Sequence, residues 1–335
     1  MKEKFRNVFW FFGIFAIVVM LFTFDMDYAE LLQNLRKAGV WFPAVILLWV
    51  FIYYLNAWSW FIIIRDGKHA KVPFWKVYKL TISGFALNYA TPVGLMGGEP
   101  YRIMELTPYV GASKATSSVI LYVMMHIFSH FCFWLASSLL YVLVEPMNWG
   151  MGIVLSVVVA ACLLAVYFFM KGYRNGMAVR TLNLLGHLPF VKKWAQRFAV
   201  EKKEALERVD AQIAELHRQR KTTFYASLGL EFAARVVGCL EVYFILNILT
   251  TDVSFLSCIL IMAFTSLFAN LFFFSPMQLG AREGGFALAT GGLAIPSAFG
   301  IYTGLITRVR ELIWIVIGVL LMKVGNGTGK LDKHE

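Results

Sequence analysis

Residues 81–106 read TISGFALNYATPVGLMGGEPYRIMEL, and residues 270–292 read NLFFFSPMQLGAREGGFALATGG. Each stretch begins with apolar residues, is then interrupted by proline and glycine, and carries charged residues just after the interruption. In a membrane protein, non-helical backbone is tolerated within the bilayer only where it is buried in protein or lines a watery cavity. Both stretches are therefore predicted to be re-entrant or broken helices.

The rest of the chain has the composition of a membrane protein. It is 59% hydrophobic and 15% charged, with a mean hydropathy of +0.66. A helix needs about 20 apolar residues to cross a bilayer, and only structures that pair every backbone polar group are stable there. We predict an all-α polytopic membrane protein with about seven or eight transmembrane helices plus one or two broken segments. The predicted spans are 8–24, 42–64, 115–144, 149–170, 223–249, 254–274 and 298–322.

The two interrupted stretches resemble each other. Both contain the pattern P-x2-L-x3-E, which runs from Pro92 to Glu99 in the first and from Pro276 to Glu283 in the second. Paired broken helices in two halves of a membrane protein indicate a repeat-related transport site near the midplane. The predicted organisation is a first membrane half at 1–170, a basic amphipathic linker at 171–222 and a second membrane half at 223–335.

The net charge of +11 is concentrated in alternate loops. Residues 171–221 contain 12 Lys or Arg against 5 Asp or Glu. Such loops face the cytoplasm, so the chain is predicted to be a multi-pass membrane protein with a cytoplasmic N-terminus. Because the basic residues follow this alternation, no nucleic-acid partner is expected.

Ionisable residues inside apolar blocks each need a partner or a purpose, because they cost about 2.5–3.5 kcal/mol at a helix centre. Arg102 follows Glu99 by three residues and precedes Glu105 by three, so a helix brings both carboxylates within its reach. Arg102 and Arg282 are predicted to hold an anionic phosphate. The alternative is that these charges are ion pairs that fix the re-entrant folds. The predicted substrate-binding set is Asn88, Pro92, Gly98, Glu99, Arg102, Glu105, Pro276, Arg282, Glu283 and Arg308.

For the remaining charged and polar residues within apolar blocks, the sequence predicts structural roles or leaves two alternatives open. Glu231 and Arg235 are spaced i, i+4, and such a pair can satisfy itself within one helix. Arg308 and Arg310 either add cations to the interior or mark a cytoplasmic edge. His126 and His130 lie one turn apart, but no third ligand is near them in sequence, so no metal site is predicted. No nucleotide-binding or hydrolase motif is present, and neither a cofactor nor a catalytic residue is predicted.

The segments GFALNYATPVGLMGGEPYR (84–102) and SPMQLGAREGG (275–285) resemble the signature stretches of the lysylphosphatidylglycerol synthase transmembrane region, a flippase-like family. The resemblance implies kinship with the lipid-flipping half of multiple peptide resistance factors. In the two-domain members, a soluble aminoacyltransferase follows and makes lysyl- or alanyl-phosphatidylglycerol. The present sequence stops at Glu335 without such a domain, so the aminoacyl-transfer step is not expected in it.

The expected function is translocation of an anionic lipid, such as aminoacylated phosphatidylglycerol or a polyprenyl-phosphate-linked lipid. Its expected partner is then that anionic membrane lipid. One alternative is a membrane component of phosphatidylglycerol lysyltransferase-type lipid modification, acting with a separate lipid-synthesising enzyme. A third is a lipid-binding scaffold in envelope biogenesis. An enzyme yields a covalent product, whereas a flippase changes only the leaflet in which the lipid lies.

Overall fold

The computed structural model describes residues 38–65, 72–90, 97–175, 220–250, 252–272 and 280–324, together with Asn7 and Phe11. This part of the chain contains nine α-helices and no strand, so the all-α prediction is confirmed for it. The helices are α3 (Trp41–Arg65), α4 (Phe74–Ala90), α5 (Gly98–Val110), α6 (Ala112–Val144), α7 (Trp149–Asn175), α11 (Lys221–Leu246), α12 (Phe255–Leu271), α13 (Ala281–Gly292) and α14 (Ser297–Leu321).

The predicted spans from residue 42 onward coincide with α3, α6, α7, α11, α12 and α14 within a few residues. By length and apolar composition, α3, α6 and the Trp149–Tyr167 part of α7 are long enough to cross a membrane. Helices α11 and α14 are of similar length but carry buried ionisable residues. The predicted span 8–24 and most of the 171–222 linker lie outside the described residues, so the total number of crossings stays a prediction.

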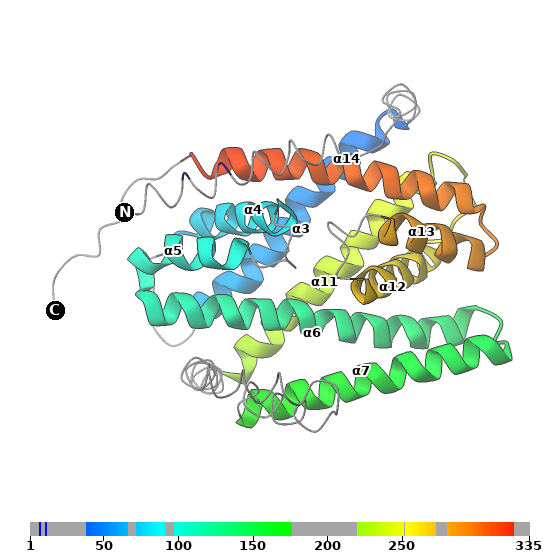
Figure 1. Ribbon diagram of the computed structural model, residues 1–335, viewed down its shortest axis with the longest axis horizontal. Coiled ribbons are helices and arrows are strands. Elements are labelled where there is room, and N and C mark those ends of the chain that lie inside the picture. The colour runs from blue at the N-terminus through cyan, green and yellow to red at the C-terminus, as the bar shows by residue number, and fades with distance from the viewer. Residues whose placement is uncertain are drawn as a thin grey trace, which may run out of the picture.

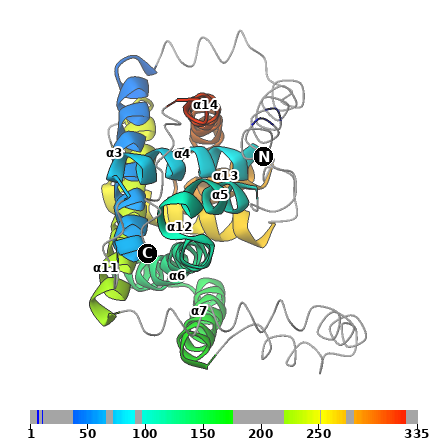
Figure 2. The same cartoon turned by 90° about the vertical axis from the view of Figure 1, so that its left-hand side faces the viewer.

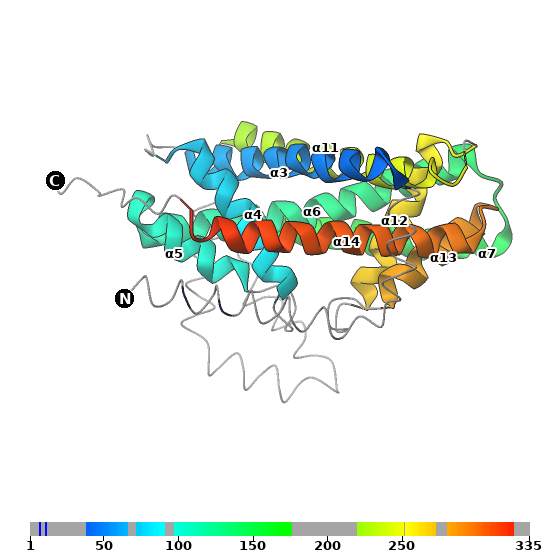
Figure 3. The ribbon, with the colours of Figure 1, turned by 90° about the horizontal axis from the view of Figure 1, so that it is seen from above.

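Each interrupted stretch contains parts of two successive helices, and we refer to α4–α5 and α12–α13 as the two broken pairs. Helix α4 ends at Ala90 and α5 begins at Gly98, while α12 ends at Leu271 and α13 begins at Ala281. The breaks themselves, with Pro92 and Pro276, fall outside the described residues. Figure 1 places the α4–α5 pair at one end of the long axis and the α12–α13 pair at the other end, and Figure 3 shows the same separation from above.

The two pairs occupy the middle of the bundle. Viewed along the long axis, they lie between α14 and α6, with α3 and α11 side by side along one flank (Figure 2). Helix α3 packs against α11, α4 packs against α14, and α12 packs against both α13 and α6. Each broken pair is thus held by a long helix that belongs to the other half of the sequence.

Small residues permit the close crossings that this arrangement needs. A Cβ atom on Gly98 would collide with the backbone carbonyl of Gly84, where α5 crosses α4. A Cβ atom on Gly318 would lie 2.5 Å from Cβ of Ala86, where α14 crosses α4. Ser83 reinforces the second crossing by donating a hydrogen bond to the carbonyl of Gly318 at 2.9 Å. The first broken pair is therefore fixed by backbone contacts that larger side chains would prevent.

Helix α7 lies at the periphery and packs on α6. Its outward side chains are large, apolar and exposed, as in a helix whose outer face is covered by lipid. They include Trp149, Ile153, Val154, Val157, Leu163 and Leu164.

Candidate functional site

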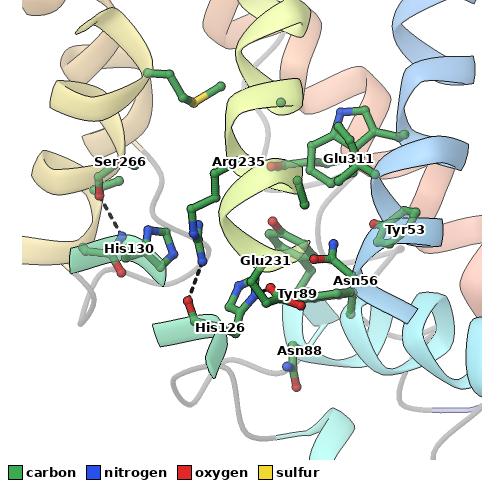
Figure 4. Close-up of a pocket in the computed structure, with 18 of the residues that line it drawn as sticks. Tyr53, Asn56, Asn88, Tyr89, His126, His130, Glu231, Arg235, Ser266 and Glu311 are labelled. Carbon is green, nitrogen blue, oxygen red and sulfur yellow. Dashed lines mark hydrogen bonds and ion pairs between the residues drawn. The ribbon is translucent and has the colours of Figure 1, made fainter. Parts of the chain in front are cut away.

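A cavity of about 350 Å³ lies in the interior, and α3, α4, α5, α6, α11, α12, α13 and α14 all contribute to its lining. The first broken pair supplies Asn88, Glu99 and Arg102, and the second supplies Asn270 and Arg282. Figure 4 shows part of this lining, with side chains from several helices directed toward one region. The two broken pairs therefore meet the same cavity from opposite ends of the bundle.

Arg102 is fixed at the crossing of α4 and α5. Its side chain is 1% exposed, and its Nη1 lies 3.5 Å from Oε1 of Glu99. Nε and Nη2 donate to the carbonyls of Leu80 and Thr81 at 3.4 and 3.3 Å. Three aromatic rings also surround the guanidinium, which favours a cation over their π faces. These rings belong to Trp60, Phe85 and Tyr122.

Asn88 organises the start of α5. Its Oδ1 accepts a hydrogen bond from the backbone N–H of Gly98 at 2.6 Å, and its Nδ2 donates to Oε1 of Glu99 at 3.0 Å. The helix start is thereby capped from within the protein, by a side chain of the preceding helix. Oε2 of Glu99 is buried and has no hydrogen-bond partner within the described residues. Among the described residues, the first broken pair thus contains one buried carboxylate oxygen without a hydrogen bond.

The start of α13 is organised by Glu283. Its Oε2 accepts a hydrogen bond from the backbone N–H of Gly280 at 3.0 Å, while its Oε1 accepts from Nε of Arg308 at 2.7 Å. Gly280 has a φ of +75°, a left-handed conformation that glycine adopts without steric cost. Glu283 therefore caps α13 and binds it to α14 at the same time.

Arg282, the next residue along, joins three helices. It forms an ion pair with Glu311 of α14 and a hydrogen bond with the hydroxyl of Tyr89 of α4. Nη1 of Arg308 also donates to Glu311, at 3.2 Å. The second broken pair is thereby connected to α14 and to the last turn of α4, which belongs to the first broken pair.

A third cluster joins α3, α11 and α14. Arg310 forms a two-bonded ion pair with Glu241, with Nε–Oε1 and Nη2–Oε2 distances of 2.8 and 2.9 Å. Trp49 Nε1 donates to the same carboxylate at 2.9 Å, and the Arg310 guanidinium carbon lies 3.8 Å from the Trp49 ring centroid. The exposed fractions of the Arg310 and Glu241 side chains are 4% and 0%. Arg310 therefore lies in the interior of the helical bundle.

Elsewhere in the cavity lining, α6 and α11 are joined by polar contacts. Nδ1 of His126 lies 2.8 Å from Oε2 of Glu231. Arg235 donates to Oγ of Ser129 and to the carbonyl of His126, each at 2.6 Å. The expected pair of Glu231 with Arg235 is thus replaced by contacts between helices. Among the described residues, no group of three or more His, Cys, Asp or Glu is placed to hold a metal ion.

The predicted site residues that the structure describes divide into three groups. Asn88, Glu99, Arg102 and Arg282 line the cavity, and Gly98 begins α5 beside it. Glu283 and Arg308 stand behind this lining: Glu283 contacts Arg308, and Arg308 contacts Glu311.

Glu105 is directed elsewhere and forms an ion pair with Lys76 at 2.6 Å. Its expected contact with Arg102 is replaced because α4 presents Lys76 on that side of α5. Pro92 and Pro276 lie outside the described residues.

Several lining residues come from α3, which sequence reasoning did not connect with the site. Trp49, Tyr53 and Asn56 line the cavity. Asn56 is a polar amide within a predominantly apolar span, and this sequence feature could have pointed to the cavity. In the structure its side chain is buried, with 5% exposure. Tyr89, next to the predicted Asn88, was also missed, because a tyrosine in an aromatic-rich membrane helix has no distinctive spacing.

An all-helical membrane protein with two broken helices around a charged interior cavity is the class that this fold and site define. The family described as "Lysylphosphatidylglycerol synthase TM region" matches residues 10–318. The chain belongs to this family, which confirms the resemblance seen in its two interrupted segments. Comparison with curated proteins and with solved structures gives no match.

Proposed function

We propose that this protein translocates an anionic lipid across the bacterial cytoplasmic membrane, with the headgroup passing through the cavity between the two broken helix pairs. Family membership supports a membrane role in lipid modification or translocation. The observation that carries the proposal is that broken helices at opposite ends of the bundle reach one charged cavity. A group bound there is exposed to one side or the other by small movements of either pair.

The size and chemistry of the cavity suit a headgroup. Its volume of about 350 Å³ is at the small end of the range for ligand pockets, so the acyl chains remain in the bilayer. Arg102 and Arg282 are the guanidinium groups contributed by the broken pairs themselves. Guanidinium binds phosphate oxygens in a two-bonded geometry that an ammonium group does not match. In the proposed bound state, Arg282 exchanges part of its contact with Glu311 for the lipid phosphate.

The packing also supports two related halves, one built from α3 to α6 and the other from α11 to α14. Helix α3 packs on α11, and each broken pair packs on the last helix of the other half, α4 on α14 and α12 on α6. Helices α3 and α11 run in opposite directions in Figure 3, as do α6 and α14. An inverted repeat of this kind provides equivalent access routes from the two leaflets.

The proposed orientation has its own test. With the basic 171–222 segment in the cytoplasm, α14 ends on the cytoplasmic side, because it returns to the end of the bundle where α11 begins (Figure 1). In a variant whose four cysteines are replaced, Asp252→Cys should react with a membrane-impermeant maleimide added to intact cells. Val324→Cys should react only after permeabilisation. The reverse labelling pattern would overturn the proposed orientation.

The site assignment is tested by Arg102→Gln and Arg282→Gln in proteoliposomes that contain fluorescent phosphatidylglycerol. Each substitution should slow translocation by roughly tenfold to a hundredfold, because a charge-assisted hydrogen bond contributes about 1.5–3 kcal/mol. Lys221→Gln, which removes an exposed cation at the start of α11, is the matched control and should retain the wild-type rate. Dithionite quenching of the outer-leaflet fluorophore measures the rate.

Three results would decide against the proposal in different ways. Equal rates for both arginine variants and wild type would remove the cavity as the phosphate site. Absence of anionic-lipid movement by folded wild-type protein would remove translocation itself. Recovery of a covalently altered lipid, detected by thin-layer chromatography in the presence of a candidate donor, would favour the lipid-modification alternative that the family's description contains.

A further inference from the structure

One part of the cavity wall is not used by the proposed phosphate site. His126 of α6 and Glu231 of α11 both line the cavity, and their Nδ1 and Oε2 atoms are 2.8 Å apart. The Glu231 side chain is 1% exposed. Within the described part of the chain, the other carboxylate oxygen of Glu231 has no hydrogen-bond partner, and neither does Nδ1 of the nearby His130. Figure 4 shows Glu231 and His126 adjacent to each other. A buried carboxylate in contact with an imidazole is a site where a proton can be bound and released.

The charge balance of the cavity indicates when such a proton would be bound. The described lining contains equal numbers of arginine and glutamate residues, so its formal charge is zero while the histidines are neutral. These residues are Arg102, Arg235, Arg282, Arg310, Glu99, Glu231, Glu241 and Glu311. A phosphodiester headgroup that enters this cavity adds a negative charge that the lining does not balance. An uncompensated buried charge is strongly unfavourable, whereas one additional proton restores neutrality.

We propose that the His126–Glu231 pair binds one proton when an anionic headgroup enters the cavity and releases it when the headgroup leaves, so that lipid and proton move together. The proton adds to the His126 ring and gives an imidazolium beside the Glu231 carboxylate. Only an N–H bond forms on entry, and the same bond breaks on exit. This inference rests on the proposed function and names the ion that drives it.

The neighbouring groups explain why the anion and the proton bind together. Arg235 donates to the His126 carbonyl at 2.6 Å, and Arg102 also acts on His126 electrostatically. Both cations disfavour an added positive charge on the His126 ring. An anion that enters the cavity weakens this repulsion and so favours protonation of the ring. The coupling is reciprocal, so a proton on His126 also strengthens anion binding. The cavity that the pair lines is also lined by the titratable groups Tyr53 of α3, Tyr89 of α4, and Tyr122 and His130 of α6, and by the neutral Thr265 and Ser266 of α12.

The first test measures proton uptake on binding. Purified full-length protein in detergent is titrated with short-chain phosphatidylglycerol by calorimetry, in two buffers of different ionisation enthalpy at the same pH. Wild type should take up about one proton per lipid bound, and His126→Gln and Glu231→Gln should take up close to none. Glutamine preserves size and hydrogen bonding at the α6–α11 contact, and size-exclusion chromatography verifies folding. Glu145→Gln at the end of α6, which lies outside the described lining, should behave as wild type.

The second test measures transport under a proton gradient. Proteoliposomes whose interior is more alkaline by one pH unit, held at zero membrane potential with potassium and valinomycin, should accumulate trace labelled phosphatidylglycerol in the inner leaflet. The expected leaflet ratio approaches about tenfold, because one pH unit is a tenfold proton gradient and the proposed stoichiometry is one to one.

The outcomes separate this inference from the proposed function. Lipid binding without proton uptake, or lipid movement that ignores the gradient, overturns the proton coupling and leaves translocation standing. Undiminished proton uptake by both variants overturns the assignment to His126 and Glu231. Failure of wild type to bind or move any anionic lipid contradicts the proposed function, and the coupling fails with it.

Discussion

Replacing Arg310 with methionine should lower the free energy of unfolding by about 3–5 kcal/mol, the cost of leaving one member of a buried ion pair without its partner. Glu241 is fully buried and receives two hydrogen bonds from Arg310, so the substitution leaves a carboxylate with only the Trp49 N–H. Methionine fills a volume similar to that of arginine. The loss of stability therefore reflects the unpaired charge of Glu241 and not an empty cavity. Unfolding in detergent, followed by tryptophan fluorescence or thermal shift, measures the change.

The double variant Arg310→Met with Glu241→Gln provides the comparison. Because it removes both charges and keeps a side-chain oxygen that can accept from the Trp49 N–H, it should recover part of the lost stability, since the cost of the single variant comes from the uncompensated buried charge. A single variant as stable as wild type would show that the Glu241 carboxylate is solvated or protonated in the folded protein. That result would contradict the closed, ion-paired interior described above.

Gly98→Ala should lower the free energy of unfolding by about 3 kcal/mol, near the upper end of the range for overpacking, and abolish lipid translocation. The added Cβ atom would meet the backbone carbonyl of Gly84 and the side-chain oxygen of Asn88. A backbone atom cannot rotate away, so α5 must move relative to α4, and Arg102 moves with it. The rate of lipid translocation and the unfolding midpoint measure the two effects.

Gly229→Ala is the matched control for this substitution. A Cβ atom on Gly229 of α11 has no neighbouring atom within 4 Å. Alanine there should leave translocation unchanged and add up to about 1 kcal/mol of stability, because glycine is the poorer helix former. If Gly98→Ala behaved like this control, the close crossing of α4 and α5 would be wrong.

The long helices could be predicted from sequence because each depends on a local property. Apolar length alone located α3, α6 and α7, and the same signal found α11 and α14 in spite of their charges. Helix boundaries within the stretches 81–106 and 270–292 were predicted from proline and glycine, which end helices by local backbone chemistry, and α5 and α13 begin at Gly98 and Ala281. The family resemblance fell on the same segments.

The partners of the charged residues could not be predicted, because they depend on how distant helices pack. Sequence spacing paired Glu231 with Arg235, whereas the structure pairs Glu231 with His126. Glu241 contacts Arg310, 69 residues away, and Trp49, 192 residues away. No periodicity connects such positions. The contribution of α3 to the cavity was missed for the same reason.

In the proposed function, the cavity carries an anionic headgroup from one leaflet to the other. The most direct test of this function is to reconstitute wild-type protein in liposomes and follow fluorescent phosphatidylglycerol beside fluorescent phosphatidylcholine. We expect phosphatidylglycerol to move at least about tenfold faster than in protein-free liposomes, which is a barrier reduction of about 1.4 kcal/mol or more, and phosphatidylcholine to move more slowly than phosphatidylglycerol. Folded protein that moves neither phosphatidylglycerol nor its lysyl form nor a polyprenyl phosphate would contradict the proposed function.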